Sequence, residues 1–106
     1  MTAEEKNRLK EKFKDVPDDR GTLVLHSDYD KIGEYDVKFE FWTYSTYAGV
    51  SAIFLREDIK SLSRQELIDL VKKECETDLV TITTPGEKFL FATYAVKDHS
   101  DDFFYF

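Results

Sequence analysis

The spacing of apolar positions at the start of the chain predicts a helix. Leu9, Phe13 and Val16 recur at helical spacing, and Thr2 precedes Glu5 by three residues, which is a capping-box pattern. The pattern predicts a helix over about residues 3–15, which Pro17 and the polar residues after it end. Because its apolar stripe is thin, we expect this helix to lie across an edge or a face of a sheet.

From residue 22 the period changes to two, which predicts strands. A first strand covers residues 22–29, with Leu23, Leu25, Ser27 and Tyr29 on one face, and residues 30–33 form a turn. In the second strand, Tyr35, Val37, Phe39 and Phe41 alternate with the polar residues Asp36, Lys38 and Glu40. We expect the first set to face inward and the second to face solvent. After a connection over residues 46–49, residues 50–56 are apolar on both faces, which predicts a central strand.

The second half of the chain predicts a helix and a closing hairpin. Ser63 is a candidate N-cap with Glu66 at the third helical position, and Leu62 can pack on Leu67 as a hydrophobic staple. Residues 79–84 and 88–97, separated by Pro85 and Gly86, predict the hairpin. The predicted fold is α+β: a twisted antiparallel sheet of about five strands with two helices, in the order αβββαββ.

Length and composition indicate one compact domain over residues 1–106, because the chain has 106 residues, 42% of them apolar. One cysteine excludes a disulfide scaffold. No apolar run approaches the roughly 20 residues of a membrane helix, and the first residues lack the pattern of a signal peptide. We therefore expect a cytoplasmic protein.

The net charge of −7 falls on residues 21–106, since the first twenty residues are neutral. An acidic body without a basic stripe disfavours direct binding of nucleic acid or an anionic membrane and allows a basic protein partner. The alternative is that the charge serves solubility alone.

Four carboxylates gather around the first predicted hairpin turn: Asp28, Asp30, Glu34 and Asp36. They are candidate partner-binding residues that can face lysine or arginine, and the alternative is a solvated turn. The spacing of Asp28, Asp30 and Gly33 resembles the start of a calcium loop, but Ile32 and Phe39 stand where oxygen ligands are required, which argues against calcium.

Three aromatic residues near the end of the second strand are further candidates for partner binding: Trp42, Tyr44 and Tyr47. Tryptophan and tyrosine bury a large area and keep a polar group, so they are enriched in interface hot spots. The alternative is that the first helix covers them through Leu9 and Phe13.

No catalytic or cofactor motif is present in the sequence. Cys75, His26 and His99 lack both the surroundings of a nucleophile and the spacing of zinc ligands, and Cys75 falls on the apolar stripe of the second helix. The glycines are isolated turn residues and form no phosphate loop. We therefore expect neither an enzyme nor a metal or cofactor.

The last segment, residues 98–106, is acidic and then aromatic. Residues Asp101 to Phe106 resemble the acidic, phenylalanine-terminated tips of single-stranded-DNA-binding proteins, which dock partner proteins. The resemblance covers six residues, and the basic groove of that family is missing, so no DNA binding is carried over. We favour a short last strand that buries the four aromatic side chains against the sheet.

These patterns predict a small acidic protein-binding module, of the inhibitor or immunity type, that presents carboxylates to a basic, nucleic-acid-binding partner. The alternative is a small-ligand-binding protein or small enzyme with a pocket between sheet and helices, lined by Tyr35, Tyr94 or His26.

Overall fold

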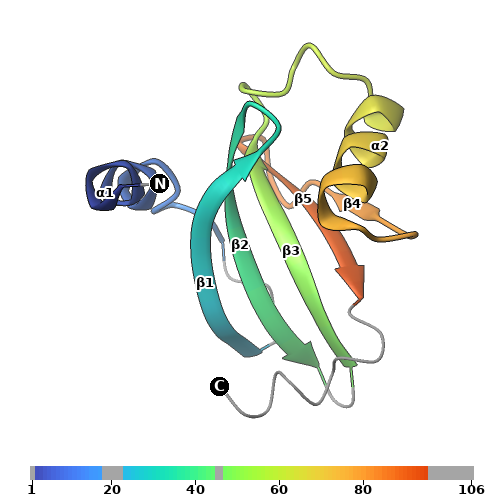
Figure 1. Ribbon diagram of the computed structural model, residues 1–106, viewed down its shortest axis with the longest axis horizontal. Coiled ribbons are helices and arrows are strands. Elements are labelled where there is room, and N and C mark those ends of the chain that lie inside the picture. Colours follow the sequence, from blue (N-terminus) through green and yellow to red (C-terminus); the bar gives the residue numbers. More distant parts are fainter. Residues whose placement is uncertain (1, 18–22, 45–46, 96–106) are drawn as a thin grey trace.

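The computed structural model describes residues 2–17, 23–44 and 47–95, and it confirms the predicted α+β class and the order αβββαββ. The elements are α1 (Ala3–Lys12), β1 (Leu23–Ile32), β2 (Tyr35–Tyr44), β3 (Tyr47–Leu55), α2 (Arg64–Cys75), β4 (Thr81–Thr83) and β5 (Phe89–Ala95). The strands form one antiparallel sheet in the order β1-β2-β3-β5-β4. The two helices lie on opposite sides of this sheet (Figure 1).

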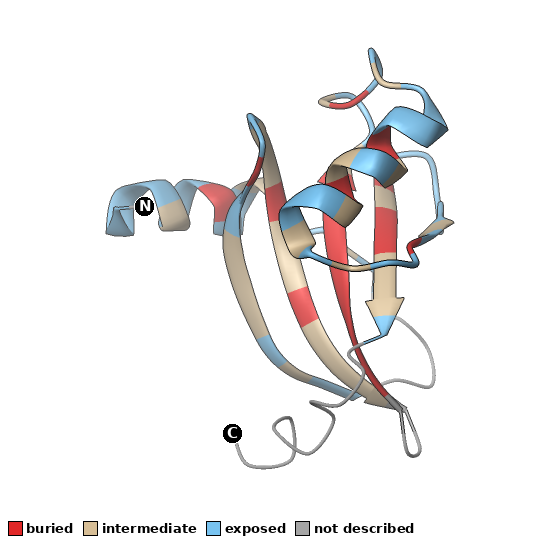
Figure 2. Cartoon of the chain, turned by 45° about the vertical axis from the view of Figure 1, so that its right-hand side comes forward, coloured by how far each residue is buried: buried red, intermediate tan, exposed pale blue. Residues whose placement is uncertain are grey.

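Each face of the sheet has its own apolar cluster. On the α2 side, Leu67 and Val71 of the helix pack with Val37, Phe54 and Ala92 of the strands. On the α1 side, the cluster comprises Leu9, Phe13, Ile53, Phe89 and Phe91. Strand β3 contributes to both, which confirms its predicted central position; Figure 2 shows the buried residues concentrated along β3 and β5.

Helix α1 begins as predicted, because the side chain of Thr2 accepts a hydrogen bond from the backbone N–H of Glu5 at 3.1 Å. It ends at Lys12, three residues earlier than predicted. Phe13 leaves helical geometry, with φ −104° and ψ 15°, and the next bonds span only three residues, from Lys14 N to Glu11 O and from Val16 N to Phe13 O. Phe13 is nevertheless buried, so the predicted apolar stripe is confirmed.

The β1–β2 hairpin is tighter and less regular than predicted. Strand β1 runs to Ile32, which pairs with Tyr35, so only Gly33 and Glu34 form the turn. Gly33 has φ +61°, a conformation that favours glycine and suits the first residue of a two-residue turn. The register shifts between Val24 and His26, and this bulge breaks the predicted alternation.

The consequence of the bulge is that Leu25 and Tyr29 do not share a face. Leu25 packs on the cluster of Ala48 and Val50, whereas Tyr29 packs on the cluster of Leu9 and Phe13 under α1. The prediction that they lie together was wrong, because one extra residue in a strand moves the following side chains to the other face.

The start of α2 matches the sequence analysis. Ser63 accepts from Glu66 N at 3.1 Å and Ser63 N donates to Glu66 Oε1 at 2.9 Å, so both halves of the predicted capping box are present. Leu62 packs on the cluster that contains Leu67, as the staple requires. Strand β3 begins at Tyr47, three residues earlier than predicted.

The prediction that Asp36, Lys38 and Glu40 face open solvent was wrong. Their side chains are exposed by only 12%, 16% and 10%. Lys38 Nζ pairs with Glu40 Oε2 at 3.2 Å. Lys12 of α1, which covers this face of the sheet, binds Asp36 at 2.7 Å. This polar face tolerates burial because its charges have partners within the chain. Residues 98–106, and with them both interpretations of the acidic-aromatic segment, lie outside the described residues.

Candidate functional site

The four carboxylates predicted around the β1–β2 turn divide into two pairs with different surroundings. Asp30 and Glu34 are exposed, and neither belongs to an ion pair among residues 2–17, 23–44 and 47–95. Asp28 and Asp36 are each bound to basic side chains of α1. Only Asp30 and Glu34 of the predicted set therefore keep a carboxylate available to a partner.

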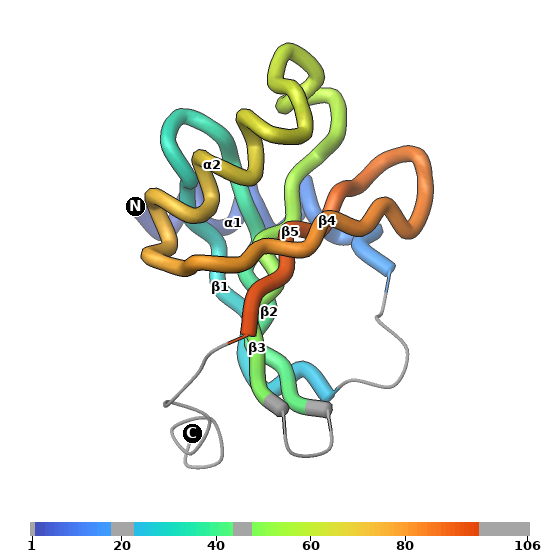
Figure 3. The backbone as a smooth tube through the Cα atoms, turned by 90° about the vertical axis from the view of Figure 1, so that its right-hand side faces the viewer, coloured from blue at the N-terminus to red at the C-terminus, as the bar shows by residue number. Residues whose placement is uncertain are grey.

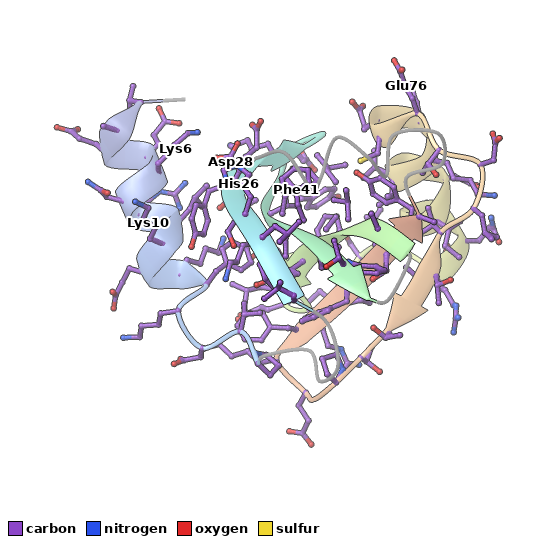
Figure 4. The ribbon with its side chains drawn as sticks, turned by 90° about the horizontal axis from the view of Figure 1, so that it is seen from below. Lys6, Lys10, His26, Asp28, Phe41 and Glu76 are labelled. Carbon is purple, nitrogen blue, oxygen red and sulfur yellow. The ribbon has the colours of Figure 1, made fainter. Side chains whose placement is uncertain are left out.

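Asp28 is joined to the first half of α1. Its Oδ1 lies 2.9 Å from Lys6 Nζ and also accepts from the backbone N–H of Tyr29 at 2.8 Å. The hydrogen bond from Lys6, helped by the one from Tyr29, outweighs partial burial and lowers the pKa of Asp28. Figure 4 shows Lys6 reaching from α1 toward Asp28 on the edge strand.

Asp36 is joined to the second half of α1. Lys12 Nζ donates to its Oδ2 at 2.7 Å, Arg8 Nη1 lies 3.5 Å from the same atom, and Lys31 Nζ lies 3.9 Å from Oδ1. Burial opposes ionisation of Asp36, but the hydrogen bond from Lys12 and the three positive charges together lower its pKa.

Lys12 also binds a second carboxylate, which sequence analysis did not single out. Its Nζ lies 2.8 Å from Oδ2 of Asp58, a buried oxygen in the loop after β3. Burial lowers the pKa of Lys12, but its contacts with Asp36 and Asp58 raise it by more, so the net shift is upward. The hairpin carboxylates thus hold α1 to the sheet.

Trp42 lies at the other end of β2 and on the α1 side of the sheet. Its indole Nε1 donates to Ser51 Oγ at 3.0 Å, which in turn bonds Thr93 Oγ1 at 3.0 Å. Its ring lies against Gly49, where there is no room for a Cβ. Leu9 and Phe13 pack on Ile53, Phe89 and Phe91 instead, so α1 does not provide the predicted cover for Trp42.

The seven predicted contact residues are therefore not gathered in one place. Trp42 lies seven positions along β2 from Tyr35, about 23 Å at the usual rise of a strand. The backbones of Tyr44 and Tyr47 pair at that far end, and their side chains are outside the described part of the structure.

A groove lies between the β1–β2 turn and α2, which we name the turn groove. Its volume is about 590 Å³, and it is lined by Gly33, Glu34, Tyr35, Leu62, Glu66, Asp69, Leu70 and Lys73. Figure 3 shows the turn beside α2, and a Cβ at Gly33 would lie 3.5 Å from Cδ1 of Leu70. The topology thus joins Glu34, a predicted site residue, to Glu66 and Asp69, which sequence analysis had not assigned to a site.

Three carboxylates line the turn groove, and they differ in how available each is to a bound partner. Glu66 is held by the backbone N–H and hydroxyl of Ser63, which lower its pKa. Asp69 accepts one hydrogen bond, from Gln65 Nε2 at 2.9 Å. Glu34 has no hydrogen bond or ion pair in the described part of the chain, so it is the most available of the three.

The remaining candidates for chemistry do not converge. Cys75 is half-buried and hydrogen-bonded to Tyr94, and burial raises the pKa of both groups. His26 stacks on Phe41 with 5.4 Å between ring centroids, and His99 is outside the described residues. Tyr35 alone of the three predicted pocket residues lines the turn groove. Among the described residues, no group of three histidine, cysteine or acidic side chains is arranged to hold a metal ion.

Comparisons of the chain with protein-family models, curated proteins and solved structures find no match. Within the described residues, neither helix has the length and apolar character needed to cross a membrane.

Proposed function

We propose that this protein is a small acidic binding module that docks a basic segment of another protein in the turn groove. The supporting observation is an apolar floor, formed by Tyr35, Leu62 and Leu70, next to a rim on which three carboxylates outnumber the one cation, Lys73. The three carboxylates are those of Glu34, Glu66 and Asp69. Lysine and arginine suit such a groove, because their aliphatic stems cover apolar surface while their charged ends reach a carboxylate.

Charge on the rest of the molecule supports the same class of partner. Asp30 is exposed on β1 two residues before Ile32, close in sequence to the turn that supplies Glu34. With a net charge of −7, the chain attracts a basic protein over a distance and repels polyphosphates. We propose further that the partner is a nucleic-acid-binding protein. The chain would cover the partner's basic surface, as an inhibitor or immunity protein does, without catalysis or a cofactor.

Binding of a labelled peptide of alternating lysine and leucine to the full chain, followed by fluorescence anisotropy, tests the proposal. The double variant Glu34→Gln/Asp69→Asn should weaken binding about tenfold and flatten its dependence on salt, since each exposed ion pair contributes about 0.2–1 kcal/mol. Glu66 is left unchanged because it caps α2.

The matched control is Glu4→Gln/Asp78→Asn, which removes the same charge from two exposed positions outside the turn groove. It should bind the peptide nearly as tightly as the parent chain. Equal weakening in both double variants would mean that net charge, and not the groove, attracts the peptide. Equal binding of a peptide in which glutamine replaces lysine would exclude recognition of a basic segment.

A second candidate function is binding of a small cationic ligand at the same place. It is favoured by the three carboxylates that line the turn groove, Glu34, Glu66 and Asp69, because a small polycation can contact all of them. Titration calorimetry with spermidine distinguishes the small ligand from the basic segment. Saturable binding of spermidine that Glu34→Gln weakens, and that is at least as tight as binding of the peptide, would favour the small ligand. Tighter binding of the peptide would favour the basic segment.

A further inference from the structure

A second groove adjoins the start of α2, and we name it the hairpin groove. It runs between the β3–α2 loop, the first turn of α2 and the β4–β5 hairpin, and its volume is about 750 Å³. Its apolar lining consists of Ile59, Leu62, Leu67, Ile82 and Leu90. Ile82 and Leu90 are only half-buried, so apolar surface is left for an occupant to cover.

Three cations line the hairpin groove: Arg56, Lys60 and Arg64. All three are exposed, and none forms an ion pair with a residue that the structure describes. The other cations without an ion pair in the described ranges are dispersed over α1 and the end of α2: Lys10, Lys72 and Lys73. Within this acidic chain, the hairpin groove is therefore the described surface that most attracts carboxylates.

Two acidic residues, Glu57 and Glu87, also line the hairpin groove and limit what it accepts. A long polyanion such as nucleic acid would meet them as well as the acidic body of the molecule. A bare phosphate would leave the apolar lining uncovered. The fitting occupant is a short acidic segment that also carries bulky apolar side chains, because it satisfies the three cations and covers the lining together.

The chain itself contains a segment with both properties. Residues 98–106 include Asp98, Asp101 and Asp102, followed directly by four consecutive aromatic residues. Their carboxylates complement the three cations of the hairpin groove, and the aromatic side chains complement its apolar lining.

The length of chain after β5 is sufficient to return this segment to the groove. Leu90 lines the groove, and β5 then ends at Ala95, about 17 Å further on at the usual rise of a strand. Asp101 and Asp102 are six and seven residues beyond Ala95, which gives them a reach of about 20 to 24 Å in an extended chain. Because the segment is joined to the groove by a short stretch of chain, its effective concentration there is in the millimolar range, and a free competitor must exceed it.

We propose that residues 98–106 of the same chain occupy the hairpin groove, with the aspartates facing Arg56, Lys60 and Arg64 and the aromatic side chains on the apolar lining. The occupied groove is closed to acidic segments of other molecules. Among the described lining residues, the two grooves share only Leu62, and the proposal does not rest on the function proposed above.

Carbodiimide cross-linking of the full chain tests which groups meet, because it joins a lysine to a carboxylate that it contacts. Mass spectrometry should identify links from Lys60 to Asp101 or Asp102. Lys10, an exposed lysine of α1 outside the groove, is the control and should form no such link. In a mixture of chains with and without nitrogen-15, the links from Lys60 should join peptides of the same label, since both come from one copy.

Release of the aromatic residues by carboxypeptidase A measures how firmly the segment is docked. Release from the full chain should be at least about tenfold slower than from a free peptide of residues 98–106, which corresponds to about 1.4 kcal/mol of docking. Lys60→Glu/Arg64→Glu should remove this difference. Arg64 is the first residue of α2, where the helix dipole favours an acidic side chain, so the variant should fold. Circular dichroism checks that it does.

Charge exchange makes the test specific to the two surfaces. Asp101→Lys/Asp102→Lys should speed release as much as the groove variant does, each chain being compared with a free peptide of its own sequence. Combining the four changes should restore slow release. The matched control Lys10→Glu/Lys72→Glu makes the same charge change at two cations outside the groove and should release as slowly as the parent chain.

Several results would overturn the proposal. Release from the parent chain as fast as from the free peptide would mean that the segment is not docked, and slow release that Lys60→Glu/Arg64→Glu leaves unchanged would place it elsewhere on the molecule. Links from Lys60 that join differently labelled chains would assign the groove to a second copy. Tight binding of an added peptide of residues 98–106 to the full chain, or of an oligonucleotide that the groove variant abolishes, would show that the groove is open to other molecules.

Discussion

Gly49 shows how one missing side chain sets the packing around it. A Cβ at this position would meet Cη2 of Trp42 at 2.7 Å and the backbone oxygen of Tyr94 at 2.9 Å. The indole of Trp42 can therefore occupy this position and donate to Ser51 only because residue 49 is glycine. Gly86, by contrast, has open space where its Cβ would be.

We predict that Gly49→Ala lowers the free energy of unfolding by about 1–3 kcal/mol, because a methyl group must displace either the indole or the neighbouring strand. Urea unfolding followed by the fluorescence of Trp42 measures it. Gly86→Ala is the control and should change stability by less than about 0.5 kcal/mol. If the two variants had equal midpoints, the close contact at Gly49 would be without energetic consequence.

At the scale of elements, the start of α2 is defined by two reciprocal hydrogen bonds between Ser63 and Glu66. We predict that Ser63→Ala costs about 0.5–2 kcal/mol of stability, since the backbone N–H of Glu66 loses the hydroxyl oxygen that accepts its hydrogen bond. Thermal unfolding measures the loss. Ser61→Ala, at an exposed position in the preceding loop, is the control and should be neutral; a neutral Ser63→Ala would show that water replaces the cap at no cost.

Helix α1 is joined to two other parts of the chain, β2 and the loop after β3, by one lysine. Lys12 stands between Asp36 and Asp58, with side-chain exposure of 22%, and Lys10 on the same helix is exposed and forms no ion pair within the described residues. Replacing Lys12 by glutamine leaves two carboxylates facing one neutral group.

We therefore predict that Lys12→Gln destabilises the protein by about 1–3 kcal/mol and raises the pKa of Asp36, whereas Lys10→Gln does neither. Denaturant unfolding measures the first effect, and carboxyl NMR titration measures the second. An unchanged pKa of Asp36 in Lys12→Gln would mean that Arg8 and Lys31 suffice to hold it.

At the scale of the whole molecule, the ion pairs make stability depend on pH in two directions. The pKa values of Asp28 and Asp36 are lower in the folded chain than the ordinary value of about 3.9. The ionised carboxylates of Asp28 and Asp36 contribute their full stabilisation of the fold above this ordinary pKa. That contribution is lost as the pH falls through the lowered pKa of the folded chain. The raised pKa of Lys12 acts at the other end, where its stabilisation is lost as pH rises above 10.5.

We predict that stability is flat from about pH 6 to 8 and falls steeply below about pH 4, with the contact of α1 against β1 and β2 weakening first. Hydrogen exchange measured by mass spectrometry at pH 7 and pH 3 tests this prediction. Between the two pH values, α1 should lose more of its protection than β3 does. Asp36→Asn should show weakened protection of α1 already at pH 7. Equal protection of α1 at both pH values would show that Leu9 and Phe13 alone hold the helix.

The fold was predictable because its signals are local. Alternation in β2, the helical stripe of Leu9 and Phe13, and the capping box at Ser63 each depend on residues within a few positions of one another. The missed boundaries and the bulge at Val24 and His26 depend on pairing with another strand, which no local pattern encodes. The candidate site was predictable in part: Glu34 lines the turn groove, whereas Asp36 and Asp28 bind α1.

The amino-acid sequence by itself determined which segments become helix or strand and that the body is acidic, because backbone preference, apolar period and charge are properties of neighbouring residues. Only the tertiary structure decided which charges remain available. Folding brings Lys12 between Asp36 and Asp58 and places Glu34 and Asp69 on the lining of one groove. It leaves Arg56 and Arg64 without an ion pair to any residue that the structure describes. Charges more than twenty residues apart meet through topology, and the distance between them determines whether a carboxylate binds its own chain or another molecule.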